Sequence, residues 1–146
     1  MKVLHQSNRP VVRGTIAAAV ISVAAYSGMA FGEEVKVTLS GAQEVPAVKT
    51  SASGGGTITI NADMSVSGSV TTTGVAGTAA HIHNGAAGKN GPVIVPLAKS
   101  GDNAWSVAAG AKLTDAQYAA YKAGDLYVNV HSAENKGGEI RGQLKP

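Results

Sequence analysis

The chain of 146 residues contains no cysteine, and its aromatic residues are one Trp, one Phe and four Tyr. The lack of cysteine excludes disulfides, iron–sulfur clusters, a thiolate nucleophile and a lipid-modified N-terminal cysteine. So few and scattered aromatic side chains do not form a stacking platform for carbohydrates or single-stranded nucleic acid. A small domain of this kind has to be held together by its core, to which a bound metal could add.

Long hydrophobic runs are also missing, apart from one near the start. Lys2, Arg9 and Arg13 form a basic region, the apolar run over residues 15–26 follows, and Gly28 and Ala30 are small. The run is too short to span a bilayer, which takes roughly 20 residues. This order is typical of a signal peptide over residues 1–30, with residues 31–146 as one domain. An uncleaved anchor or a disordered tail is the alternative interpretation.

The predicted mature protein has no excess of either charge. The whole chain carries a formal net charge of +3, but three of its cations lie in the first 30 residues, which leaves nine Lys plus Arg and nine Asp plus Glu. A neutral surface gives no reason to expect binding to nucleic acid or, after signal cleavage, to a membrane. It permits self-association into a homo-oligomer. We expect an exported protein, either periplasmic or secreted.

Short stretches with alternating or β-branched apolar residues, separated by turns, predict an all-β fold. We expect a Greek-key β-sandwich or barrel of about eight short strands. The hairpin turn at 61–63 and glycines in turns at 54–56 and 84–91 separate some of them. The predicted strands are Val35–Leu39, Thr57–Ile60, Met64–Thr71, Thr78–His83, Pro92–Leu97, Ala104–Ala108, Asp125–His131 and Glu139–Leu144, with Trp105 in the core.

One segment, Thr114–Ala123, predicts a short helix instead. Thr114 is placed as the N-cap, Gln117 would complete a capping box, and Gly124 would end the helix. Leu113 is placed to pack onto Tyr118. So short a helix needs tertiary packing to persist, so we interpret it as a connector that lies against the strands.

Three histidines on two of the predicted strands are the strongest functional signal. His81 and His83 are two residues apart, and His131 ends the run that contains Tyr127 and Asn129. Residues i and i+2 point to the same face of a strand, so three imidazoles would converge if the strands are neighbours. Such a site suits copper or zinc. The alternative is a structural cluster in which the histidines bond to loop backbone or to Asn129.

Other polar residues carry weaker signals. Ser132 lies in no nucleophile-elbow motif, so hydrolytic chemistry has little support. The nearest candidates for further oxygen ligands, or for partners of the ligands, are Glu44, Asn129 and Glu139. The simpler interpretation is that each is a polar residue at the surface or in a turn. Glu134 and Glu139 flank glycines and are expected to be exposed.

Several motifs together resemble the CHRD domain, named after chordin and common in exported bacterial proteins. The motifs are Leu39–Pro46 (LSGAQEVP), Ala80–Gly85 (AHIHNG), Asn90–Val93 (NGPV), Gly124–His131 (GDLYVNVH) and Gly138–Leu144 (GEIRGQL). The resemblance runs from about Val35 to Leu144. It implies a β-sandwich fold and an extracellular setting more than it implies an activity.

A more distant resemblance concerns the copper/zinc superoxide dismutases, which are Greek-key sandwiches. It implies His81, His83 and His131 as copper ligands and Arg141 as a cation that guides an anionic substrate. No histidine lies between Asn84 and Val130, so the bridging histidine and the zinc ligands of that family are absent, as are its cysteines. For a lone arginine in a strand, a solvated side chain or an ion pair with Glu134 or Glu139 is the other interpretation.

These observations predict an exported protein that binds a transition metal, copper or alternatively zinc, and does not catalyse efficiently. An extracellular interaction module without metal is one alternative. A superoxide dismutase-like enzyme that lacks zinc is another.

Overall fold

The computed structural model describes residues 32–146, and the predicted signal peptide over residues 1–30 lies outside them. The fold is all-β with one short helix, as the sequence predicts. The elements are β1 (Glu33–Ser40), η1 (Gly41–Gln43), β2 (Ser53–Ile60), β3 (Val66–Thr73), β4 (Gly77–Asn84), β5 (Val93–Gly101), β6 (Ala104–Val107), α1 (Asp115–Lys122), β7 (Leu126–Ser132) and β8 (Ile140–Leu144).

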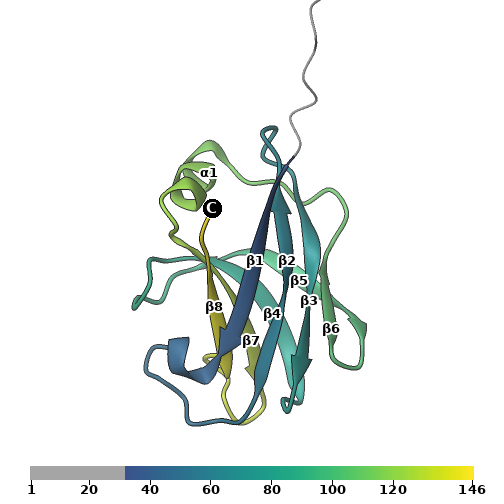
Figure 1. Ribbon diagram of the computed structural model, residues 1–146, viewed down its shortest axis with the longest axis vertical. Coiled ribbons are helices and arrows are strands. Elements are labelled where there is room, and N and C mark those ends of the chain that lie inside the picture. The colour runs from purple at the N-terminus through teal and green to yellow at the C-terminus, as the bar shows by residue number, and fades with distance from the viewer. Residues whose placement is uncertain (1–31) are drawn as a thin grey trace, which may run out of the picture.

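The eight strands close into an antiparallel barrel in the order β1-β2-β3-β6-β5-β4-β7-β8 (Figure 1). The neighbours β3 and β6, and β4 and β7, are not consecutive in the chain, which gives the barrel Greek-key connections. The second of these pairings brings the two histidine-bearing strands together. Because β1 pairs with β8, the barrel closes and the sheet has no unpaired edge strand.

Alternation along the strands builds the core inside the barrel. In β1, Val35, Val37 and Leu39 are buried while Lys36 and Thr38 are exposed, as period-2 alternation predicts. Trp105 is buried, which confirms its expected place in the core. The other large, fully buried apolar side chains include Ile58, Ile60, Val70, Ile82, Leu126, Val128, Val130, Ile140 and Leu144.

The helix α1 forms where the sequence predicts it. The Thr114 side chain accepts from the Gln117 backbone N–H, and the Gln117 side chain accepts from the Thr114 backbone N–H, which completes the capping box. Gly124 follows the helix with φ of 79°, the left-handed conformation in which glycine is favoured. Tyr121 is buried in the core and donates to Glu33 at the start of β1, so the helix packs against the barrel.

Two details of the strand prediction are wrong. The glycines at 54–56 lie inside β2 rather than in a turn, and Met64 lies in the β2–β3 turn with φ of 69° rather than in a strand. A Cβ on Gly56 would lie 2.0 Å from the carbonyl oxygen of Ser69 in β3. These glycines therefore permit close approach between two backbones, a use of glycine that turn chemistry does not anticipate.

Candidate metal centre

The outer face of β4 and β7 carries the predicted histidines side by side. The two strands pair so that Ala79 lies opposite His131, His81 opposite Asn129, and His83 opposite Tyr127. The intervening Ala80 and Ile82 point into the barrel and are buried. The histidines therefore share the outer face, which confirms the placement expected from their spacing.

The three imidazoles converge on one point. His81 Nδ1 lies 3.1 Å from His131 Nε2, and one ring nitrogen from each histidine lies within 4.8 Å of the other two. Nitrogen ligands of one ion at about 2.0–2.1 Å lie about 3.3–3.6 Å apart in tetrahedral or trigonal geometry. Small rotations of the rings would therefore bring all three nitrogens to a single metal ion.

Backbone carbonyls determine which nitrogens are free to bind. His83 Nδ1 lies 2.9 Å from the carbonyl oxygen of Gly91, and His131 Nδ1 lies 2.9 Å from that of Lys136. A carbonyl oxygen only accepts, so each Nδ1 carries the proton and each Nε2 keeps a lone pair. His83 Nε2 is buried and has no hydrogen-bond partner among residues 32–146. The candidate ligand atoms are His83 Nε2, His131 Nε2 and, once its proton is displaced, His81 Nδ1, which donates to His131 Nε2 at 3.1 Å.

The electrostatics keep two of these imidazoles neutral. Burial lowers the pKa of His81, and the neighbouring His131 and His83 lower it further. Burial also lowers the pKa of His83, against the hydrogen bond to Gly91, which raises it. Because only a neutral imidazole has a lone pair to give, both side chains are in the form that binds a metal at neutral pH.

Arg141 lies beside this cluster but not at the surface. Its side chain is 1% exposed, and its guanidinium lies over the Tyr127 ring with Cζ 3.4 Å from the ring centroid. Nη2 donates to the carbonyl oxygen of Ala86 at 3.0 Å. The interpretation of a solvated arginine, or one paired with Glu134 or Glu139, is therefore wrong, because the loops over β8 cover the side chain.

The three oxygen-bearing candidates are all buried as well. Glu44 is 7%, Asn129 1% and Glu139 8% exposed, so none of them is a surface residue and the exposure expected of Glu139 is wrong. Glu44 and Glu139 do lie in loop segments, as the turn interpretation has it. Asn129 donates to Glu44 and to the carbonyl oxygen of Ile140, while its own Oδ1 has no partner among the described residues. Glu139 accepts from Thr50 at 2.8 Å. Glu44 and Asn129 therefore contact each other, while Glu139 is held separately by Thr50.

Glu44 is the carboxyl group most affected by this burial. Desolvation raises its pKa to about 7, although the hydrogen bond from Asn129 and the charge of Arg141 act in the opposite direction. Hydrogen bonds, led by that from Ser132, lower the pKa of Glu139 instead. For Glu44 the effect of burial on the pKa is the largest, whereas for Glu139 the hydrogen bonds outweigh it.

Three loops meet over the site. Figure 1 shows the segment after η1 and the β4–β5 loop on the side of the barrel where β7 and β8 lie. Asn90 of the β4–β5 loop donates to the carbonyl oxygen of Val45 at 2.7 Å. A cleft of about 440 Å³ lies between the segment after η1, Asn90 and the β7–β8 loop, and Glu44 and Lys136 are among its lining residues. The cleft borders the loops that supply both carbonyls to the histidines.

Sequence reasoning missed the groups that orient the histidines. The carbonyls of Gly91 and Lys136 carry no signal in residue type, because any residue supplies a backbone carbonyl. Tyr127 stacks on His83 with ring centroids 4.8 Å apart and planes 7° apart. Tyr127 lies two residues before Asn129 on the same face of the strand, and this spacing was a signal for the contact. The view that the aromatic residues are too scattered to act together did not use it.

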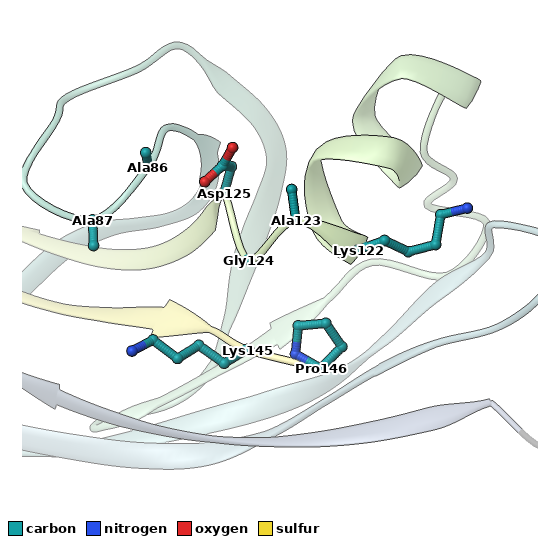
Figure 2. Close-up of a pocket in the computed structure, with 8 residues that line it drawn as sticks. All are labelled: Ala86, Ala87, Lys122, Ala123, Gly124, Asp125, Lys145 and Pro146. Atoms are coloured by element: carbon teal, nitrogen blue, oxygen red, sulfur yellow. The ribbon is translucent and has the colours of Figure 1, made fainter.

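A second hollow, of about 480 Å³, lies between the end of α1, the β4–β5 loop and the C-terminal residues. Figure 2 shows Lys122 and Lys145 extending away from each other, so their ammonium groups do not converge on a common point. No histidine lines it. We therefore place the functional site at the histidines.

Comparisons with known proteins give one match. A family model described as CHRD domain matches residues 35–144. Neither the curated proteins nor the solved structures gave a match. Within residues 32–146, the structure has no helix with the length and apolar character needed to cross a membrane.

Proposed function

The chain belongs to the CHRD domain family, and we propose that it is an exported protein that binds copper through His81, His83 and His131. Zinc is the alternative metal. Export rests on the basic, apolar and small-residue pattern of residues 1–30. Whether the destination is the periplasm or the medium depends on the cell that makes the protein.

The observation that carries the proposal is the buried Nε2 of His83. A buried polar atom without a partner costs about 1–3 kcal/mol, so proteins rarely leave one. Here the atom belongs to a group of three histidines, one ring nitrogen of each lying within 4.8 Å of the other two. A metal ion would satisfy this atom and would replace the proton shared between His81 Nδ1 and His131 Nε2.

The donor set supports copper. All three donors are imidazole nitrogens, for which Cu²⁺ has the highest affinity among the divalent first-row metals. His81 and His131 are only partly buried, so a bound ion would keep at least one coordination position toward solvent. Copper held there would supply one-electron redox chemistry.

An interaction module without metal would be favoured if backbone hydrogen bonds used up the histidines. Gly91 and Lys136 each occupy one nitrogen, but His83 Nε2 has no partner among the described residues, and His131 Nε2 is bonded to the neighbouring His81 rather than to the backbone. A dismutase-like activity would need more than this site offers, because residues 84–130 hold no histidine that could bridge to a second metal. We therefore propose binding rather than efficient turnover.

Metal uptake tests the proposal directly. The purified protein is titrated with Cu⁺, Cu²⁺ and Zn²⁺ in the presence of a competing chelator, with His83→Ala as the test variant. Thr71→Ala, at an exposed position of β3, is the control. We expect one copper per chain in the wild type and the control, and a loss of at least about tenfold in affinity for His83→Ala. Absence of stoichiometric uptake, or equal binding by the variant, would overturn it.

A further inference from the structure

We propose that Arg141 and Tyr127 are positioning residues for the metal centre: they fix the β4–β5 loop and, through it, the orientation of His83. The inference rests on the proposed metal binding. It assigns Arg141 a role inside the protein instead of the anion-guiding role that the dismutase resemblance implies.

The first support is a three-layer stack on neighbouring strands. His83 of β4 lies against the face of Tyr127 of β7, with planes 7° apart, and the guanidinium of Arg141 lies on the same ring. All three side chains are at least nine-tenths buried. Because the His83 ring lies flat against the Tyr127 ring, it cannot turn out of this plane without displacing Tyr127.

The second support is the way the loop is held. Arg141 donates through Nη2 to the Ala86 carbonyl at 3.0 Å and through Nη1 to Asn90 Oδ1 at 3.4 Å. The Gly91 N–H donates to the Tyr127 hydroxyl at 3.1 Å, and the Gly91 carbonyl accepts from His83 Nδ1. The loop is therefore bound to the stack at Ala86, at Asn90 and at Gly91 itself, whose carbonyl sets the tautomer of His83.

The chemistry of arginine explains its presence here. A planar guanidinium can lie on an aromatic ring while its edge donates in several directions, which an ammonium group cannot do. The acceptors that Arg141 reaches, Ala86, Asn90 and Gln143, are uncharged. A buried cation without a hydrogen-bonded carboxylate costs stability. The presence of Arg141 is therefore better explained by its role in holding the β4–β5 loop.

The first measurements are made on the metal-free protein and concern the tautomer of His83 and the exchange of the Gly91 N–H. Ring ¹⁵N chemical shifts report whether Nδ1 of His83 carries the proton, and hydrogen exchange reports the Gly91 N–H. Arg141→Lys is expected to lose the fixed tautomer and to speed exchange of the Gly91 N–H about tenfold or more. Tyr127→Phe keeps the ring stack and removes the acceptor of the Gly91 N–H, so it is expected to speed that exchange alone.

Copper affinity is then measured on the same proteins. Arg141→Lys is expected to bind about 10–100-fold more weakly, as is usual when groups that orient a ligand are changed. Lys122→Met is the control, because it removes a cation that lies over a different tyrosine, Tyr118, on α1. A melting temperature close to that of the wild type shows that the barrel is intact.

The outcomes separate the two proposals. If the wild type takes up no copper, the proposed function fails, while the metal-free spectra still decide whether Arg141 orients His83. If Arg141→Lys keeps the His83 tautomer and the Gly91 exchange rate, or keeps copper affinity within about threefold, the positioning role is wrong. If Arg141→Lys does not fold, unchanged Gly91 exchange in Tyr127→Phe would overturn it.

Discussion

Glu44 is a carboxyl group whose charge is disfavoured by its surroundings. It directly follows η1, its side chain is buried, and it accepts from the neutral amide of Asn129. Burial raises its pKa from 4.5 to about 7. Because the folded state then binds the proton more tightly than the unfolded chain, Glu44 lowers stability as the pH rises from about 4.5 to 7.

The substitution Glu44→Gln tests this effect at the residue scale. Glutamine keeps an oxygen that can accept from Asn129 but carries no charge, so the fall in stability between pH 5 and pH 7.5 should become shallower. We expect a difference on the order of 2 kcal/mol across that range. Urea unfolding at several pH values measures it, with Glu34→Gln, at an exposed position in β1, as the control. Parallel pH profiles for wild type and Glu44→Gln would contradict the assignment.

The strand β2 shows how one element depends on the absence of side chains. A Cβ on Gly56 would lie 2.0 Å from the Ser69 carbonyl oxygen and 2.7 Å from the Val70 Cα, both in β3. Backbone atoms in a paired strand cannot shift far without breaking the ladder of hydrogen bonds. Glycine at this position is therefore required by the β2–β3 pairing.

We expect Gly56→Ala to destabilise the protein by about 2–3 kcal/mol, the upper part of the usual range for overpacking. Gly137→Ala is the matched control, because nothing lies within 4 Å of its added Cβ and its φ is not in the left-handed region. Chemical unfolding followed by circular dichroism gives both values. A Gly56→Ala protein as stable as Gly137→Ala would show that β2 and β3 can separate at little cost.

How far the elements follow from sequence depends on which physical signal each one carries. Alternation placed β1, an apolar run placed β7, and the capping residues around Thr114 placed α1, because these signals lie within a few neighbouring residues. The glycines of β2 were misplaced because a turn and a close backbone approach favour the same residue. Which one applies depends on β3, which the local sequence of β2 does not contain.

At the scale of the whole molecule, the barrel order decides what becomes a site. The histidines could be placed on one face from spacing alone, but their convergence depends on the β4–β7 pairing. The burial of Glu44, Glu139 and Arg141 could not be predicted, since loops from three distant parts of the chain cover them. Long-range pairing and loop coverage leave little trace in the residues of any one strand.

Metal binding should also stabilise the whole fold. The three ligands come from two strands, and their tautomers depend on the loops before β5 and β8, so an ion that binds only the folded state links these parts. At a free copper concentration of about 100 times Kd, the expected gain is about 2.7 kcal/mol, which raises Tm by several degrees. Calorimetry measures this shift, and the triple substitution of His81, His83 and His131 by alanine should abolish it. An equal shift in the triple variant would place the metal elsewhere.

The coordination of copper itself tests the central claim most directly. X-ray absorption at the copper edge of the loaded protein reports the number and type of nearest ligands. We predict three imidazole nitrogens at about 2.0 Å, reduced to two in the His83→Ala protein. A first shell with fewer than two imidazoles in the wild type, or the same shell in wild type and His83→Ala, would contradict a three-histidine copper site.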